Sequence, residues 1–310
     1  MTTKPEEKVI NFMALVKPMN ALSIILIVGS LVLLGVRGLN FGLDFTGGTV
    51  IEVSASQDVV LEDVRSALEA GGYGDATVQH FGSSRDVMVR VPPHEDDNGD
   101  EVGAAVFGII ATASPGVELR RVEFVGPQVG DELRDQSGLA VLMAMIMMVI
   151  YIWFRFSNKF GLATLLALMH DVVIVLGCFA LFRWSFDLTV LAAVLAVVGY
   201  SINDTIVIAD HIREDFHKSR LGDPVTVINR AVTRTLSRTM ITGLTTLLVL
   251  GALYLFGGEM IRGFSVTLIL GVIVGTYSSI YVANGILLAM KVGKEDFMLH
   301  ETQKEIDDMP

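Results

Sequence analysis

Six long apolar runs constrain what this chain can fold into more than any other feature of its sequence. They cover residues 19–36, 139–156, 162–182, 188–209, 240–256 and 264–290. Each is close to the roughly 20 residues that an α-helix needs to cross the hydrocarbon core of a bilayer. Because a backbone in lipid must satisfy its own hydrogen bonds, we expect six transmembrane helices. A composition of 52% hydrophobic and only 18% charged residues agrees with this.

The distribution of Lys and Arg predicts how these helices are oriented. With the N-terminus inside, 14 of the 23 basic residues fall on the cytoplasmic side, in segments 1–18, 155–159, 210–239 and 291–310. The short loops on the other side carry three, namely Arg37, Arg183 and Arg262. Short loops rich in Lys and Arg stay in the cytoplasm. We therefore expect both termini there, with 210–239 forming a cytoplasmic loop that includes an amphipathic helix.

The one long hydrophilic stretch, residues 38–137, predicts a folded domain outside the cytoplasm. Alternation typical of strands occurs at residues 49–55, 76–81, 87–91 and 117–124, and helical periodicity occurs at 58–70 and 101–113. The order β-α-β-β-α-β is that of the ferredoxin-like α+β fold. The fold class is thus a six-helix membrane protein, half of a larger bundle, with one such domain.

Charge and motif content exclude several classes of function. The domain carries 18 Asp and Glu against six Arg, which disfavours binding to nucleic acid. Its acidic run at 94–101 lacks the spacing of a calcium loop, and Cys178 is the single cysteine, so we expect no metal site. The chain has no phosphate-binding G-x-x-x-x-G-K-[ST] motif. We expect neither a cofactor nor an enzymatic activity, and an ion gradient is the remaining source of energy.

The fourth run holds a group of polar residues where lipid would favour apolar ones. Tyr200, Ser201, Asn203, Asp204 and Thr205 interrupt a segment of Leu, Ala, Val and Ile. Ionisable residues within a span usually face the interior of the bundle and mark an ion pathway. Burial disfavours the charged carboxylate, so Asp204 could take up and release a proton. The alternative is a helix-end residue that reaches the headgroups, because Asp204 lies about 7–8 Å from the expected cytoplasmic end of the span.

Two other spans and one loop contribute further candidates. His170 and Asp171 are adjacent in the third span and so point about 100° apart; we expect Asp171 to serve a proton path or helix packing, and His170 to pack. Gly271 and Gly275 form a small-residue face for close helix packing. Arg230, Arg234 and Arg238 recur every four residues, which is typical of cytoplasmic anchoring. Arg238 lies close in depth to Asp204, where its charge could stabilise the carboxylate.

Five motifs, spread over almost the whole chain, resemble the SecF family. They are FGLDFTGG at 41–48, FVGPQVGDEL at 124–133, GYSINDTIVIADHIR at 199–213, RTLSRTMITGLTT at 234–246 and YLFGGEMIRGF at 254–264. The third is the most specific. The related SecD family shares the general pattern but has a much larger exported region, whereas the domain here has about the size found in SecF.

The resemblance implies a multi-pass protein of the cell inner membrane with the RND-superfamily helix arrangement. It implies a SecDF complex with SecD, association with the SecYEG channel and YajC, and use of the proton-motive force to assist export of unfolded polypeptides. By matching position, Asp204 corresponds to the family's essential membrane carboxylate, Arg238 to its functional arginine, and Asp171 to the acidic residue of its third span. Some relatives couple to sodium instead.

We expect the exported domain to move through Gly-rich tethers on its two sides. These hinge candidates are Gly42, Asp44, Gly47, Gly48, Gly126, Pro127 and Gly130. Two other functions stay open: a self-sufficient RND-type exporter of small molecules or lipids, and a purely structural assembly subunit. A single half-bundle and a small domain speak against the exporter.

Overall fold

The computed structural model describes residues 9–93, 99–155, 157–218, 223–293 and 296. It divides into two compact units. The first comprises Met1–Asn40, Leu142–Trp184 and Thr189–Pro310, and the second Phe41–Val141 and Ser185–Leu188. Our predictions for residues 1–8, the acidic run at 94–98, and the tail at 297–310 lie outside the described residues.

Six long helices match the six expected spans. They are α1 (Val16–Arg37), α5 (Pro127–Arg155), α6 (Asn158–Phe182), α7 (Leu188–Lys218), α8 (Pro224–Phe256) and α9 (Arg262–Ala289), with short 3-10 turns at Phe12–Leu15 and Glu259–Ile261. They form the helical bundle of the first unit, except that α5 belongs to the second unit as far as Val141 and α7 begins there at Leu188. Each of the six helices is long and apolar enough to cross a membrane. The predicted multi-pass helical fold is therefore confirmed.

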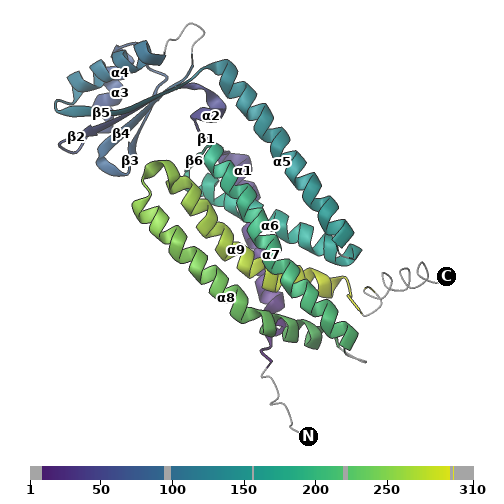
Figure 1. Cartoon of the computed structure of the whole chain (residues 1–310). Coiled ribbons are helices and arrows are strands. Elements are labelled where there is room, and N and C mark those ends of the chain that lie inside the picture. The colour runs from purple at the N-terminus through teal and green to yellow at the C-terminus, as the bar shows by residue number, and fades with distance from the viewer. Residues whose placement is uncertain (1–8, 94–98, 156, 219–222, 294–295, 297–310) are drawn as a thin grey trace. The chain divides into compact units, whose positions relative to one another are not determined.

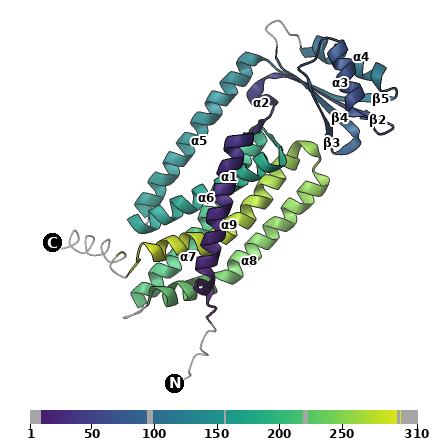
Figure 2. The same ribbon diagram turned by 180° about the vertical axis from the view of Figure 1, so that it is seen from behind.

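Helices α6 and α9 lie inside the bundle, whereas α1, α5 and α8 present apolar surface. Helix α1 crosses both α6 and α9, as Figure 2 shows. Ile24, Ile25 and Val32 of α1 and Leu248 and Val249 of α8 are exposed. Uncharged apolar faces of this kind are suited to hydrocarbon or to another apolar helix bundle.

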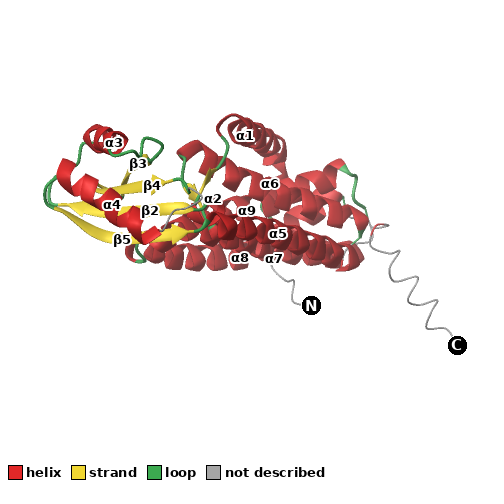
Figure 3. Ribbon diagram, turned by 90° about the horizontal axis from the view of Figure 1, so that it is seen from above, coloured by secondary structure: helices red, strands yellow, loops and turns green. Residues whose placement is uncertain are grey.

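The second unit contains the predicted ferredoxin-like domain. Its elements are β1 (Asn40–Phe41), α2 (Leu43–Thr46), β2 (Gly48–Ala55), α3 (Leu61–Ala70), β3 (Thr77–Phe81), β4 (Ser83–Val91), α4 (Gly99–Ala113), β5 (Val117–Val125) and β6 (Ser185–Phe186). The four long strands form an antiparallel sheet in the order β3-β4-β2-β5, and β1 pairs with β6. Helices α3 and α4 cover one face of the larger sheet (Figures 1 and 3). This order confirms the βαββαβ prediction.

The core of this domain follows from the alternation that the sequence carries. Ile51 and Val53 of β2 and Val89 of β4 point to the helical side and are almost fully buried. They meet Val64 of α3 and Val106 of α4, which are also buried. Side chains two residues apart on a strand share a face, so one apolar set packs against both helices.

Two helices run further than the hydropathy predicted, which changes the expected segment at 210–239. Helix α7 continues nine residues past 209 to Lys218, and α8 already begins at Pro224. Asp223 caps α8 by accepting from the amide of Thr226, and Pro224 occupies the first turn. The helix expected within 210–239 is therefore present, and it is continuous with the fifth span.

On the second side of the domain, the hinge candidates Pro127 and Gly130 lie in the first turn of α5, which begins at Pro127. Proline favours the first turn of a helix, where its missing N–H is not needed. A Cβ atom at Gly130 would lie 2.9 Å from the backbone nitrogen of Gly47, so these two glycines let the segments approach closely. Asp44 accepts a 2.9 Å hydrogen bond from the Leu188 amide, and Gly42 donates to Phe186 at 2.8 Å. A hinge role for these residues stays a prediction.

Gly48→Ala is expected to destabilise the domain by well over 1 kcal/mol, since Gly48 adopts φ +107° and an added Cβ would lie 2.3 Å from the Val91 carbonyl oxygen. Gly72 is a matched control because it also has positive φ, +91°, but open space around its Cβ position. Hydrogen exchange of the β2 amides in the full chain measures the difference. Equal protection in the two variants would contradict the steric explanation.

Candidate functional site

Two carboxyl groups lie inside the helical bundle, and their surroundings differ. Asp171 of α6 has an exposed fraction of 0% and Asp204 of α7 one of 3%. Both helices are apolar around these positions, so each carboxylate depends on the protein for its hydrogen bonds. The number of hydrogen-bond donors around each carboxylate therefore determines how stable its ionised form is.

Asp171 is fully partnered and joins three helices. Its Oδ2 accepts from Ser201 Oγ of α7 at 2.6 Å and from Ser278 Oγ of α9 at 2.8 Å. Its Oδ1 lies 2.9 Å from Nδ1 of the neighbouring His170. Short bonds to a carboxylate are among the stronger hydrogen bonds in proteins. Asp171 therefore serves as the polar centre that holds α6, α7 and α9 together.

His170 and Asp171 were expected to point about 100° apart, with His170 in a packing role, and both lie inside the bundle. Both are buried, because α6 is covered by neighbouring helices on more than one side. The two side chains leave the helix about 100° apart, yet the imidazole turns back to meet the carboxylate. They form a pair inside the bundle.

Asp204 is buried without a partner for one of its oxygens. Among the described residues, no donor lies within hydrogen-bond distance of its Oδ2. It is the seventeenth of 31 residues in α7, so it lies near the middle of that helix. The alternative was a side chain that reaches the headgroups, whereas the side chain of Asp204 is buried among helices.

The polar residues around Asp204 divide between the two sides of α7. Ser201 and Thr205 are buried, and Thr205 donates to the Ser201 carbonyl at 3.1 Å. Tyr200 is half-buried, and its hydroxyl has no partner among the described residues. Asn203 is exposed in the single chain. In the single chain it is not part of the buried cluster, because its side chain leaves α7 about 100° away from that of Asp204.

The arginines of α8 have separate roles. Arg234 forms a 2.8 Å ion pair with Asp215, which is 2% exposed, and so links α8 to the extension of α7. The positive charge of Arg238 acts on the Asp204 carboxylate. Arg238 itself is exposed, and the described residues include no direct ion pair between the two side chains. A cation thus stands near Asp204 without neutralising it by contact.

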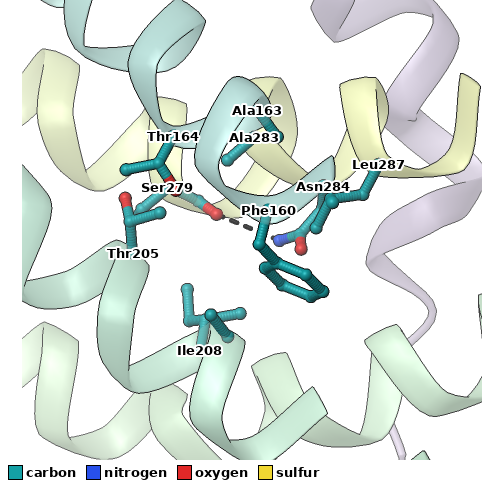
Figure 4. A pocket seen from close by; sticks show the side chains of 10 residues that line it. Phe160, Ala163, Thr164, Thr205, Ile208, Ser279, Ala283, Asn284 and Leu287 are labelled. Atoms are coloured by element: carbon teal, nitrogen blue, oxygen red, sulfur yellow. Dashed lines mark hydrogen bonds between the residues drawn. The ribbon is translucent and has the colours of Figure 1, made fainter. Parts of the chain in front are cut away.

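A cavity of about 10 Å³, shown in Figure 4, lies between α6, α7 and α9. It is lined by Phe160, Ala163, Thr164, Thr205, Ile208, Ala209, Ser279, Ala283, Asn284 and Leu287. Three polar lining groups have committed their hydrogens to backbone carbonyls: Thr205 to Ser201, Ser279 to Thr276, and Asn284 to Ser279 and Ile280. The cavity has room for about one water molecule, which would find hydrogen-bond acceptors there.

Small residues allow the helices around this site to approach. A Cβ at Gly271 would lie 2.0 Å from a methyl group of Val197, and one at Gly275 would lie 3.0 Å from Ser201 Cβ. The two glycines therefore face α7 next to the serine that binds Asp171. The described residues contain no group of three or more His, Cys, Asp or Glu that could hold a metal ion.

Sequence reasoning missed the contribution of α9 and α1 to this site. Ser278 reaches Asp171, and the neighbouring Tyr277 donates to the Met19 carbonyl at 2.6 Å. Ser23 lies 2.8 Å from the same tyrosine hydroxyl. Hydroxyl groups inside an apolar span were the available signal, but the sequence does not tell which helix they face.

Comparison with known proteins gives consistent matches. The family model "Protein export membrane protein SecD/SecF, C-terminal" matches residues 108–293, and "SecD/SecF GG Motif" matches residues 32–59. The chain is 48% identical to protein translocase subunit SecF of Vibrio alginolyticus over 308 residues, which is 98% of each chain. It is 48% identical to the Pseudomonas aeruginosa SecF over 301 residues, covering 97% of this chain and 98% of that one.

Solved structures match over nearly the whole length of this chain. SecDF from Thermus thermophilus, described as a translocon-associated membrane protein, superposes with a TM-score of 0.83 at 36% identity and covers 94% of this chain. A SecDF structure in a super-membrane-facing form gives 0.68 at 34% identity and covers 98%. This chain spans only 40% and 41% of those two solved chains.

Asp171→Asn is expected to destabilise the bundle by about 2 kcal/mol, since an amide keeps one acceptor oxygen and turns an N–H donor toward other donors. Asp210→Asn is the matched control on α7: Asp210 is 53% exposed and pairs with Arg155 at 3.1 Å, so its loss should cost less than about 0.5 kcal/mol. Thermal unfolding of the full chain in detergent compares them. Equal midpoints would show that the Asp171 network does not stabilise the bundle.

Proposed function

The chain belongs to the SecF family of protein translocase subunits, and on that basis we propose that it couples the proton-motive force to the export of unfolded polypeptides. The coupling group in this proposal is Asp204. Protonation removes its charge, and release of the proton restores it. The bundle then alternates between two packings that the two charge states favour.

The observation that carries the proposal is the contrast between the two buried carboxyl groups. Asp171 has three partners, whereas Oδ2 of Asp204 has none among the described residues. A buried carboxylate oxygen without a donor is costly, and binding a proton relieves that cost. A group whose ionised form requires a change in its surroundings is suited to drive a conformational change.

Arg238 favours the ionised form of Asp204 and so opposes the effect of burial. Its charge already acts on Asp204 without direct contact. A rearrangement that brings the guanidinium against the carboxylate would favour release of the proton, because an opposite charge nearby stabilises the ionised form. Proton release then depends on the arrangement of α7 and α8, which is what coupling requires. Asp171, by contrast, organises the bundle in this proposal while Asp204 changes its charge.

The partners of the chain in this proposal are SecD, the SecYEG channel and YajC. This chain covers 40% of a solved SecDF chain, so the remainder of that arrangement would come from SecD. The exposed apolar faces of the bundle are suited to such a partner. The membrane is the cell inner membrane, with both termini in the cytoplasm, which the distribution of Lys and Arg supports.

The α/β domain engages the emerging polypeptide outside the cytoplasm in this proposal. The segments that contain Gly42, Asp44, Gly47 and Gly48 on one side, and Gly126, Pro127 and Gly130 on the other, pass the motion of the helices to it. Since α5 is helical from Pro127, the second connection acts as a rigid arm. The flexible part is then restricted to the residues just before it.

Asp204→Asn is expected to abolish the stimulation of export by the proton gradient, since asparagine keeps the size of the side chain but cannot bind or release a proton. Asp210→Asn makes the same chemical change on the exposed face of α7 and should leave stimulation unchanged. Export of a polypeptide into inverted membrane vesicles, with the proton and sodium gradients collapsed separately, measures both variants.

Normal stimulation in the Asp204→Asn variant would remove this residue from the mechanism. It would then favour a structural assembly role for the chain. Loss of stimulation on collapse of the sodium gradient alone would keep the carboxylate as the coupling group but replace the proton by sodium.

A further inference from the structure

His170 is a buried histidine with one ring nitrogen engaged and the other without a partner. Its exposed fraction is 2%, and its Nδ1 lies 2.9 Å from Asp171 Oδ1. No atom of the described residues lies within hydrogen-bond distance of its Nε2. Its ring stacks on Tyr277 of α9 with centroids 6.1 Å apart. A buried imidazole nitrogen without a hydrogen-bond partner is uncommon in proteins and calls for an explanation.

Oδ2 of Asp171 faces the hydroxyl groups of Ser201 and Ser278, and Ser278 Oγ also lies 3.1 Å from the Gly275 carbonyl. With Asp171 ionised, both of its oxygens only accept hydrogen bonds. Nδ1 of His170 then carries the hydrogen that it donates to Oδ1. In the neutral ring the proton then sits on Nδ1, and Nε2 presents a lone pair. The unpartnered nitrogen is therefore a proton acceptor.

The groups that face His170 are an anion, an aromatic ring and uncharged polar groups. On its own helix the neighbour is the Asp171 carboxylate, and on α9 it is the ring of Tyr277. Helix α7 contributes the uncharged Ser201, with Asp204 three residues further along, and α1 contributes Ser23 and the Met19 carbonyl through Tyr277. In the described parts of the chain, no Lys or Arg pairs with Asp171. An imidazolium would find an anion and an aromatic face.

We propose that the His170–Asp171 pair is a second proton-binding site of the bundle. A proton adds to the lone pair of Nε2 and forms an N–H bond, while the Nδ1–H bond and the Asp171 carboxylate remain as they are. The product is an imidazolium paired with a carboxylate, so the pair becomes neutral overall when the proton binds. Burial of a neutral ion pair costs less than burial of a lone charge.

Protonation of His170 would affect the contact between α9 and α1. Tyr277 commits its hydrogen to the Met19 carbonyl, so Ser23 must be the donor in its 2.8 Å contact with the tyrosine oxygen. A charged ring stacked on Tyr277 therefore acts on a residue that ties α9 to α1. This deepens the proposed function and rests on it for its role in export, but proton binding at His170 can be tested independently of Asp204.

Nitrogen-15 NMR of the full chain in lipid bilayers tests the site directly. Met169–His170 is the single Met–His pair in the sequence, so carbonyl-labelled Met with nitrogen-labelled His identifies His170 in the unmodified protein. Through one-bond correlations, its ring nitrogens should show hydrogen on Nδ1 alone at about pH 9, and on both nitrogens as the pH is lowered to about 5. A ring that keeps a bare Nε2 throughout, or that carries its neutral proton on Nε2, would overturn the proposal.

The variant His170→Asn tests whether this site contributes to export. The asparagine amide nitrogen occupies nearly the position of Nδ1, so it can still donate to Asp171, but nothing replaces Nε2. In the vesicle assay we expect this variant to export while its stimulation loses part of its dependence on pH, whereas Asp204→Asn loses stimulation altogether. An unchanged pH profile in His170→Asn would exclude the site from coupling. Stimulation that survives Asp204→Asn would refute the proposed function without deciding the NMR result.

Discussion

A carboxylate withdrawn from water must find donors in the protein, and Asp171 finds them on its own helix and on two others. Ser201 and Ser278 approach one oxygen and His170 the other. These contacts require α7 and α9 to come close to α6, and Gly271 and Gly275 make room where α9 meets α7. The polar centre and the small residues beside it therefore belong to one packing arrangement. Replacing the carboxylate would remove the hydrogen bonds between the helices, and replacing a glycine would keep the helices too far apart to form them.

The position of the Asp204 carboxyl group depends on the hydrogen bonds of Asp171. Asp204 lies on α7 one turn beyond Ser201, so its helix is held in place by the Asp171 network. Held there, it is buried but incompletely bonded, with the charge of Arg238 nearby. Proteins commonly use two titratable groups in different surroundings so that one stays ionised while the other changes its protonation state. His170 adds a third group: protonation would make it positively charged, whereas protonation makes Asp204 neutral.

Much of the fold could be predicted because its two units carry simple periodic signals. The strand alternation at 49–55 and 117–124 specified β2 and β5 almost to the residue, since one face of the sheet is buried. Hydropathy found six spans but not the ends of α7 and α8, because it cannot see caps such as Asp223 or ion pairs such as Arg234 with Asp215. The approach of Ser278 to Asp171 depends on which face α9 presents, and the burial of both His170 and Asp171 depends on α6 being surrounded. Neither of these two features can be predicted from the residues next to it in the sequence.

Difference infrared spectroscopy of the carboxyl C=O stretch tests the central claim most directly. The full chain, assembled with its partner in lipid vesicles, would be compared across a pH step. The account predicts one protonated-carboxyl band that gains intensity on acidification, is absent in Asp204→Asn and persists in Asp171→Asn. A titrating band that disappears with Asp171 and survives the loss of Asp204 would contradict the division of roles between the two carboxyl groups.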